Sequence, residues 1–218
     1  MTPNPISDVL HFVFAWSWTT AVFWLLILGS IAIAAYAWTN IEGQRTSRHL
    51  ADWACRFLIG AMWWQQTLWK LPPYYTDHPE DPTHTGLYYW MTALGKSAAI
   101  PLQGDFVNNI VLPHFYLFAP VVYGLEVLTA VSLMLGVFVR FWGAIGALQI
   151  LNLWLGLYND GTDGEWPWTY FFLLVLQVIF ALHQYGRSLG LDAIIVDRWA
   201  RATRGRSPVS SLVLGALT

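Results

Sequence analysis

Charged side chains are scarce in this sequence. They make up 11% of its 218 residues, whereas hydrophobic residues make up 56%. An ordinary soluble domain carries about 25% charged residues, so this composition excludes a typical soluble domain of the same size. The sequence also contains 14 tryptophans, and indole side chains favour the membrane–water interface. The composition therefore predicts a membrane protein.

Cysteine is nearly absent, and so are the common nucleotide-binding motifs. Cys55 is the only cysteine, which excludes an internal disulfide, a CxxC thiol relay and a thiolate metal cage. The sequence also lacks a P-loop, a dinucleotide fingerprint, a nucleophile elbow and a nucleic-acid-binding module. We therefore predict no metal or nucleotide cofactor and no nucleic-acid partner.

Five apolar segments approach the length of roughly 20 residues that a helix needs to cross a bilayer. They are residues 16–38, 51–71, 115–139, 141–158 and 168–183. Pro72 and Pro73 end the second segment, because proline cannot continue a helix. The third and fourth segments follow almost without a loop, which predicts a tight antiparallel hairpin. The first segment lacks the basic residues that precede a signal peptide core, so we predict a membrane anchor.

Basic residues in the connections predict the orientation of these five spans. Eight arginines fall on one side, namely Arg45, Arg48, Arg140, Arg187, Arg198, Arg201, Arg204 and Arg206. The opposite side has Lys96 and the acidic residues Asp8, Asp77, Glu80, Asp81, Asp105, Asp160, Asp163 and Glu165. Cytoplasmic connections carry the excess of lysine and arginine. The sequence therefore predicts an amino terminus outside the cell and a carboxyl terminus in the cytoplasm.

Glu126 is an acidic residue well inside a predicted span, and ionisable groups inside a membrane are functional candidates by default. It lies 12 residues after His114 and 14 before Arg140, which predicts a position near the middle of the membrane. One interpretation is a redox-linked proton carrier or an anchor for a quinone head group. The other is a structural ion pair in which Arg56 holds the second and third spans together. Lys70 is an alternative partner for Glu126.

One face of the second span combines cations, an indole and a glycine. Arg56, Gly60, Trp63, Thr67 and Lys70 recur at steps of four, three, four and three, which places them on one stripe of a helix. A flat quinone ring could stack on Trp63 and accept hydrogen bonds from the polar residues. The alternative is a helix–helix contact with a snorkelling Lys70. We expect Trp64 and Trp69 of this segment to face lipid or the interface.

Polar and small residues on the last two spans predict helix packing. Amide side chains often hold membrane helices together, and small residues let helices approach closely. The residues concerned are Gln149, Asn152, Gly156, Tyr170 and Gln177, with Gly143, Gly146 and Ala147 as the contact surface.

The predicted outer loop contains two further features. His78, Asp81 and His84 could be imagined as metal ligands, but their spacing fits no defined element and favours a solvated loop. Residues 87–94 predict a short amphipathic helix on the membrane surface. At the other end of the chain, the carboxyl-terminal arginines predict contact with anionic membrane lipids.

Three short motifs resemble the DoxX/DoxD family of integral membrane proteins. The run from Arg56 to Gly60, continuing to Lys70, resembles the family's opening helix. Glu126 followed by residues 133–136 and Arg140 is similar to its Glu, Leu-Leu-x-Gly and Arg helix, and residues 186–192 resemble its terminal Gly-Arg-x-Ser-Leu-Asp turn. The resemblance covers residues 53–192.

This resemblance implies an all-α membrane protein with a four-helix bundle over residues 51–192. Residues 16–38 would then add one amino-terminal transmembrane helix, giving five spans in a single domain, and residues 193–218 would form a basic cytoplasmic tail. The DoxD branch implies a subunit of thiosulfate:quinone oxidoreductase in the bacterial inner membrane, working with a second subunit. Other relatives imply a maturation factor or a non-catalytic scaffold for a periplasmic or respiratory redox complex.

The outer face expected here argues against direct use of thiosulfate. Thiosulfate is a dianion, and an acidic surface would repel it. A partner subunit could supply that site, whereas contact with quinone needs only the membrane face. The sequence therefore favours quinone as cofactor, with Arg56, Gly60, Trp63, Thr67, Lys70 and Glu126 as candidate binding residues, and it leaves the catalytic residues undefined.

Overall fold

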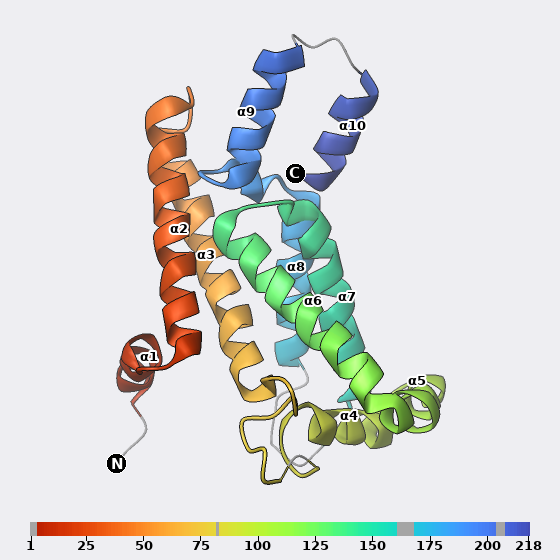
Figure 1. The fold of residues 1–218 in the computed structure, drawn as a ribbon. Helices are drawn as coiled ribbons and strands as arrows, with labels where there is room; N and C mark the ends of the chain where they lie inside the picture. Colours follow the sequence, from red (N-terminus) through yellow and green to blue (C-terminus); the bar gives the residue numbers. More distant parts are fainter. Residues whose placement is uncertain (1–3, 82, 161–167, 204–207) are drawn as a thin grey trace.

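A computed structural model describes residues 4–81, 83–160, 168–203 and 208–218 (Figure 1). These residues form ten α-helices and no β-strand. The first five helices are α1 (Pro5–Phe14), α2 (Trp18–Asn40), α3 (Ser47–Thr67), α4 (Gly86–Ser97) and α5 (Pro101–Phe106). The others are α6 (Phe115–Leu135), α7 (Val139–Gly156), α8 (Trp168–Leu182), α9 (Leu191–Thr203) and α10 (Pro208–Leu217). The all-helical prediction is confirmed.

The five predicted apolar segments correspond to helices α2, α3, α6, α7 and α8. Side-chain caps begin two of them, because Ser17 accepts a hydrogen bond from the Thr20 amide and Thr46 accepts one from the His49 amide. Two of the helices, α2 and α6, are long and apolar enough to cross a membrane by length and composition.

The predicted hairpin between residues 139 and 141 is a tight turn between α6 and α7. Gly136 ends α6 in the left-handed conformation, with φ at 72°, which glycine adopts without a steric penalty. Phe138 also has a positive φ of 50° and starts α7 directly afterwards. The two helices therefore turn back on each other within three residues.

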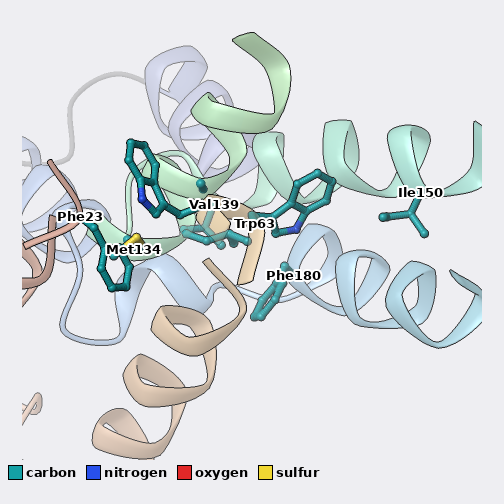
Figure 2. Packing of buried hydrophobic residues seen from close by; sticks show 9 residues of the cluster. Phe23, Trp63, Met134, Val139, Ile150 and Phe180 are labelled. Atoms are coloured by element: carbon teal, nitrogen blue, oxygen red, sulfur yellow. The ribbon is translucent and has the colours of Figure 1, made fainter. Parts of the chain in front are cut away.

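Helices α3, α6, α7 and α8 form a bundle in which α3 packs on α6 and α7 packs on α8 (Figure 1). Helix α2 lies outside this bundle and contacts α3, α6 and α9. The main core draws on α2, α3, α6, α7 and α8 and contains Phe23, Trp63, Trp64, Ala130, Leu133, Met134, Val139, Ile150 and Phe180 (Figure 2). The expectation that Trp64 faces lipid is wrong, because this side chain is only 5% exposed in the core that α2 helps to cover.

Much of the predicted loop at residues 73–114 is helical. Helix α4 confirms the amphipathic helix expected at 87–94, with Leu87, Met91 and Leu94 buried in a second core. It is followed by α5 and by short helical turns at η2 (Val107–Val111) and η3 (Leu112–His114) that lead into α6. Both α4 and α5 lie across the end of the bundle where α6 begins (Figure 1).

The bundle has two chemically different ends. The first, here called the basic end, contains the α2–α3 turn, the α6–α7 turn and α9. It has six described arginines against four acidic residues, namely Arg45, Arg48, Arg140, Arg187, Arg198 and Arg201 against Glu42, Asp52, Asp192 and Asp197. The second, here called the acidic end, contains α1, α4, α5 and the loops beside them, with Asp8, Asp77, Glu80, Asp81, Asp105 and Asp160. Four further residues of the predicted charge pattern, Asp163, Glu165, Arg204 and Arg206, lie outside the described residues.

Helices α9 and α10 occupy most of the region expected as a basic tail. They extend from the basic end of the bundle (Figure 1). Helix α10 returns to the start of α7, where Arg140 donates a hydrogen bond to the carbonyl oxygen of Gly215.

Candidate functional site

The five residues of the predicted α3 stripe form one buried face of the helix. Arg56, Gly60, Trp63 and Thr67 are buried within α3, and Lys70 is buried in the short turn η1 (Leu68–Lys70) that follows it. This face packs against α6. The helix–helix contact is therefore confirmed, and each residue of the stripe makes its own kind of contact.

Gly60 lets α3 and α6 approach at close range. A Cβ atom on this residue would lie 2.8 Å from both the backbone nitrogen and the Cγ atom of Met134. A side chain at position 60 would therefore force the two helices apart. Trp63 lies in the main core beside this contact, so its indole is part of the packing.

Lys70 forms an ion pair with Glu126 at the acidic end of α3. The Lys70 Nζ atom lies 2.6 Å from Glu126 Oε1, and both side chains are only 6% exposed. The hypothesis that Arg56 pairs with Glu126 is wrong, and so is the alternative that Lys70 snorkels to the surface. Helix α6 runs antiparallel to α3 (Figure 1), and Leu133 and Met134 lie against Gly60. Glu126, about two turns earlier on α6, therefore lies level with the last turn of α3.

The surroundings of this pair are aromatic and leave one polar atom without a partner. The Lys70 ammonium lies 4.2 Å from the centroid of the Trp69 ring, within the range of a cation–π interaction. Tyr123 lies one turn before Glu126 on α6, and its ring contacts that of Tyr75. Glu126 Oε2 is buried, and none of the described residues donates a hydrogen bond to it.

Thr67 lies on the same face, about one turn from Lys70. Its hydroxyl donates a hydrogen bond of 2.7 Å to the carbonyl oxygen of Trp64. The proton of this hydroxyl is therefore used inside α3, while its oxygen can still accept a hydrogen bond.

Arg56 caps α6 at the opposite end of the stripe. Its guanidinium is completely buried and donates to the carbonyl oxygens of Leu133 and Met134, the latter at 3.2 Å. The last carbonyls of a helix lack partners within the helix and attract cations. Lys70 follows Arg56 by 14 residues, which corresponds to about 21 Å along a helix. The two cations of the stripe therefore cannot contact one quinone head group.

Asp192 completes the α6–α7 turn from the start of α9. Its carboxylate accepts hydrogen bonds from the amides of Phe138 at 2.7 Å and Val139 at 3.2 Å, and its own amide donates to Gly136 at 2.8 Å. Burial raises the pKa of Asp192 from 3.8 to about 6, although these hydrogen bonds and the nearby charge of Arg56 act in the opposite direction. Asp192 thus serves as the amino-terminal cap of α7.

A second set of hydrogen bonds joins the α2–α3 turn to residues 187–189. The Gln44 side chain donates to the Arg187 carbonyl at 3.0 Å and accepts from the Leu189 amide at 2.9 Å. The Ser188 hydroxyl donates to Asp52 at 2.9 Å and lies 2.8 Å from His49 Nδ1. Together with Arg56, Gly136 and Asp192, these residues form a network that we call the basic-end junction.

Sequence reasoning missed the basic-end junction, although part of its signal was visible. Residues 186–192 stood out as a turn motif, but their role as partners of the α6–α7 turn was not predicted. Three glycines allow this contact, since a Cβ atom on Gly136 or Gly190 would clash across the turn and one on Gly186 would lie 2.0 Å from an Asp192 oxygen. The close spacing of Gly186, Gly190 and Asp192 is the signal that pointed to a compact polar turn.

The predicted packing residues of α7 and α8 hold helices together. Gln149 donates to the Thr129 hydroxyl at 3.3 Å, and Asn152 accepts two hydrogen bonds from Gln103. A Cβ atom on Gly143 would lie 2.7 Å from the backbone nitrogen of Ala181, so this glycine permits close contact between α7 and α8. Their structural role is confirmed.

The histidines of the outer loop pair with neighbouring carboxylates in solvent. His78 Nδ1 lies 3.0 Å from Glu80, and His84 Nδ1 lies 2.7 Å from Asp81, with all four side chains exposed. The hydrogen bond to Glu80 raises the pKa of His78. Within the described ranges, no group of three or more histidine, cysteine or acidic residues is placed to hold a metal ion.

Comparisons with protein-family models, with curated proteins and with solved structures find no match for this chain. The resemblance to the DoxX/DoxD family therefore remains an expectation that rests on the quoted residues. The functional argument depends on the geometry of α3 and α6.

Proposed function

We propose that this protein is a multi-pass membrane subunit of a redox complex and that it binds quinone at the Lys70–Glu126 pair. The observation that carries this proposal is the buried ion pair between α3 and α6, with one carboxylate oxygen unpartnered. Buried ion pairs rarely add to stability, because desolvation of both charges offsets their attraction. Their presence inside a membrane domain indicates function by default.

The membrane placement rests on helix length and on the charge at the two ends. Helices α2, α3, α6 and α7 contain 23, 21, 21 and 18 residues, and α8 has 15 described residues. A span of about 30 Å needs about 20 residues. The basic end would face the cytoplasm and the acidic end the outside, in a cell membrane with the amino terminus outside.

The chemistry of the pair suits a quinone head group. The Lys70 ammonium has donors beyond the one used by Glu126 and can donate to a quinone carbonyl. Glu126 Oε2 can accept a hydrogen bond from the hydroxyl group of a quinol. Thr67 lies about one turn from Lys70 on the same face of α3. Trp69 provides an indole beside Lys70. Of the candidate residues, Arg56, Gly60 and Trp63 would then support the fold around this site.

Electrons would enter from a donor bound by another subunit. The exposed carboxylates of the acidic end would repel a dianion such as thiosulfate, so the oxidising site would belong to the partner. This chain would contribute the quinone site and the membrane anchor.

A non-catalytic scaffold or maturation factor is the second candidate function. This function is favoured by the packing of three candidate residues. Arg56 and Gly60 contact α6, and Trp63 lies in the main core. In this case, the Lys70–Glu126 pair would only fix the pairing of α3 with α6.

The discriminating experiment measures quinone retained by the protein purified from native membranes. The Lys70→Met/Glu126→Leu double variant removes both charges together and should fold but lose its quinone. Trp69→Leu should weaken quinone binding by about threefold to tenfold if stacking contributes roughly 0.5–1.5 kcal/mol. Trp154→Leu removes an indole on α7 and is the matched control.

Two outcomes would decide between the candidates. If the folded double variant retains as much quinone as the parent protein, the pair is not the binding site. If the parent protein itself retains none and other subunits still co-purify with it, the scaffold function replaces this proposal. Trp63→Ala is a poor probe, because truncating a core tryptophan costs about 3–5 kcal/mol of stability.

A further inference from the structure

Helix α1 has no buried residue and exposes an apolar stripe. Ile6, Val9, Leu10 and Phe14 are 70%, 60%, 52% and 68% exposed. Val9, Leu10 and Phe14 follow Ile6 by three, four and eight residues, which places all four on one side of the helix. The exposed polar residues Ser7, Asp8 and His11 occupy another arc of its circumference. An isolated helix of 10 residues is marginal in water, so a further contact must stabilise this one.

Contacts with the first turns of α2, including one between the rings of Phe14 and Trp24, fix α1 at the acidic end of that helix. The rings of Phe12 and Phe23 lie 5.0 Å apart, and the Trp24 indole donates to the Val13 carbonyl at 2.9 Å. Helix α1 is seen nearly end-on beside the start of α2, so it lies crosswise to that helix (Figure 1). The contacts with α2 therefore hold α1 in place, while the described part of the chain leaves most of its apolar stripe uncovered.

We infer that α1 lies in the outer membrane–water interface, with Ile6, Val9, Leu10 and Phe14 inserted among the lipids. This inference rests on the membrane placement under the proposed function, but not on quinone binding. Helix α2 also exposes apolar side chains, among them Leu25, Leu28 and Ile31, and a crosswise amphipathic helix is typical of an interfacial element. Lipid would therefore cover the exposed apolar side chains of both helices.

The residues between α1 and α2 mark the level of the interface. Trp16 is fully exposed and Trp18 is 63% exposed, and tryptophan is enriched at the membrane–water boundary. The described part of the chain has no lysine or arginine before Arg45. The binding surface for α1 is therefore the boundary between lipid head groups and acyl chains, and binding does not require anionic lipids.

A second apolar surface lies at the same end of the bundle, on the opposite flank. Leu102 and Phe106 of α5 and Ile110 of the following turn are 77%, 47% and 46% exposed. Helix α5 lies at the far side of the bundle from α1 (Figure 1). Exposed apolar residues on both flanks at one level fit a common lipid interface.

The test measures the surroundings of single spin labels on the full chain in phosphatidylcholine vesicles. In a Cys55→Ser background, labels are attached to Leu10→Cys on the apolar stripe and Ser7→Cys on the polar arc. Leu25→Cys in the middle of α2 reports on the span itself. Collisions with oxygen, which concentrates in lipid, are compared with collisions with a water-soluble nickel chelate. The label of Leu10→Cys should collide several-fold more with oxygen and several-fold less with nickel than that of Ser7→Cys.

Three results would overturn the inference, and they differ from one another. In the first, the Leu10→Cys label collides with nickel as often as the Ser7→Cys label, while the Leu25→Cys label is in lipid. Helix α1 then lies in water and α2 lies in the membrane. A Leu10→Cys label that meets neither reagent is covered by protein, such as a second copy or another subunit. A Leu25→Cys label that meets nickel places α2 outside the bilayer, and then the proposed membrane placement fails as well.

Discussion

Removal of the Glu126 carboxylate would leave the Lys70 ammonium buried and without its partner. The two atoms lie 2.6 Å apart, and each side chain is 6% exposed. Breaking a buried pair by removing one partner costs about 3–5 kcal/mol. We expect Glu126→Leu to lower the free energy of unfolding by this amount, because the cation-π contact with Trp69 cannot replace a neutralising charge.

Removal of both charges should recover most of this stability. Lys70→Met/Glu126→Leu replaces the pair by two apolar side chains of similar length, a change that is often neutral in protein interiors. Arg56→Met combined with Glu126→Leu should show no recovery. Arg56 is about 21 Å from Lys70 along the helix, so its loss and that of Glu126 should be additive.

Thermal unfolding of the purified variants in one detergent measures these differences. For a chain of 150–250 residues, about 1 kcal/mol shifts the Tm by about 2–4 °C. Glu126→Leu should therefore lower the Tm by roughly 6–20 °C. The reasoning is refuted if the Lys70→Met/Glu126→Leu variant is no more stable than Glu126→Leu, or if Arg56→Met restores stability instead.

Three further predictions concern packing, pH and topology. Gly60→Ala should destabilise the protein by about 1–3 kcal/mol through overpacking against α6, whereas Gly124→Ala, which has open space around its Cβ position, should be neutral or stabilising in thermal unfolding. The pKa of Asp192 is raised from 3.8 to about 6 in the folded protein, so the folded state binds the proton more tightly and stability should fall as the pH rises across this interval. Asp192→Asn should lose this pH dependence, and an unchanged slope of Tm against pH would contradict the assignment. A reporter fused after Thr218 should be active in the cytoplasm and one placed near Asp81 should be active outside; equal signals from both would rule out the odd number of spans.

The positions of the long helices could be predicted because long apolar runs leave few alternatives. Residues 16–38 lack any charge, and the observed helix α2 lies within two residues of both predicted ends. The α3 stripe could also be predicted, since the spacing of Arg56, Gly60, Trp63 and Thr67 defines one helical face irrespective of what packs against it. The close approach at Gly60 followed from the same logic.

The partner of Glu126 could not be predicted, because it depends on how α6 crosses α3. Counting residues from the two borders placed Glu126 in the middle of a straight span. Because Leu133 and Met134 lie against Gly60, Glu126 instead lies beside Lys70, at the end of α3. The hydrogen bonds that Asp192 accepts from the α6–α7 turn and that Gln44 accepts from Leu189 join positions 53 or more residues apart, and no local pattern specifies such contacts.

The two cations of the α3 stripe differ in chemistry as well as in position. A guanidinium presents several donors in a fixed plane and suits the carbonyl oxygens at the end of a helix, which is where Arg56 lies. An ammonium is a compact charge with three donors that can be shared between an ionic partner and a ligand. Since Arg56 is engaged by α6, it does not compete for Glu126, and Lys70 and Glu126 stay paired where α3 ends. Under the proposed function, substitution of Arg56 would alter stability without touching the ligand site, whereas substitution of Lys70 or Glu126 alone would alter both.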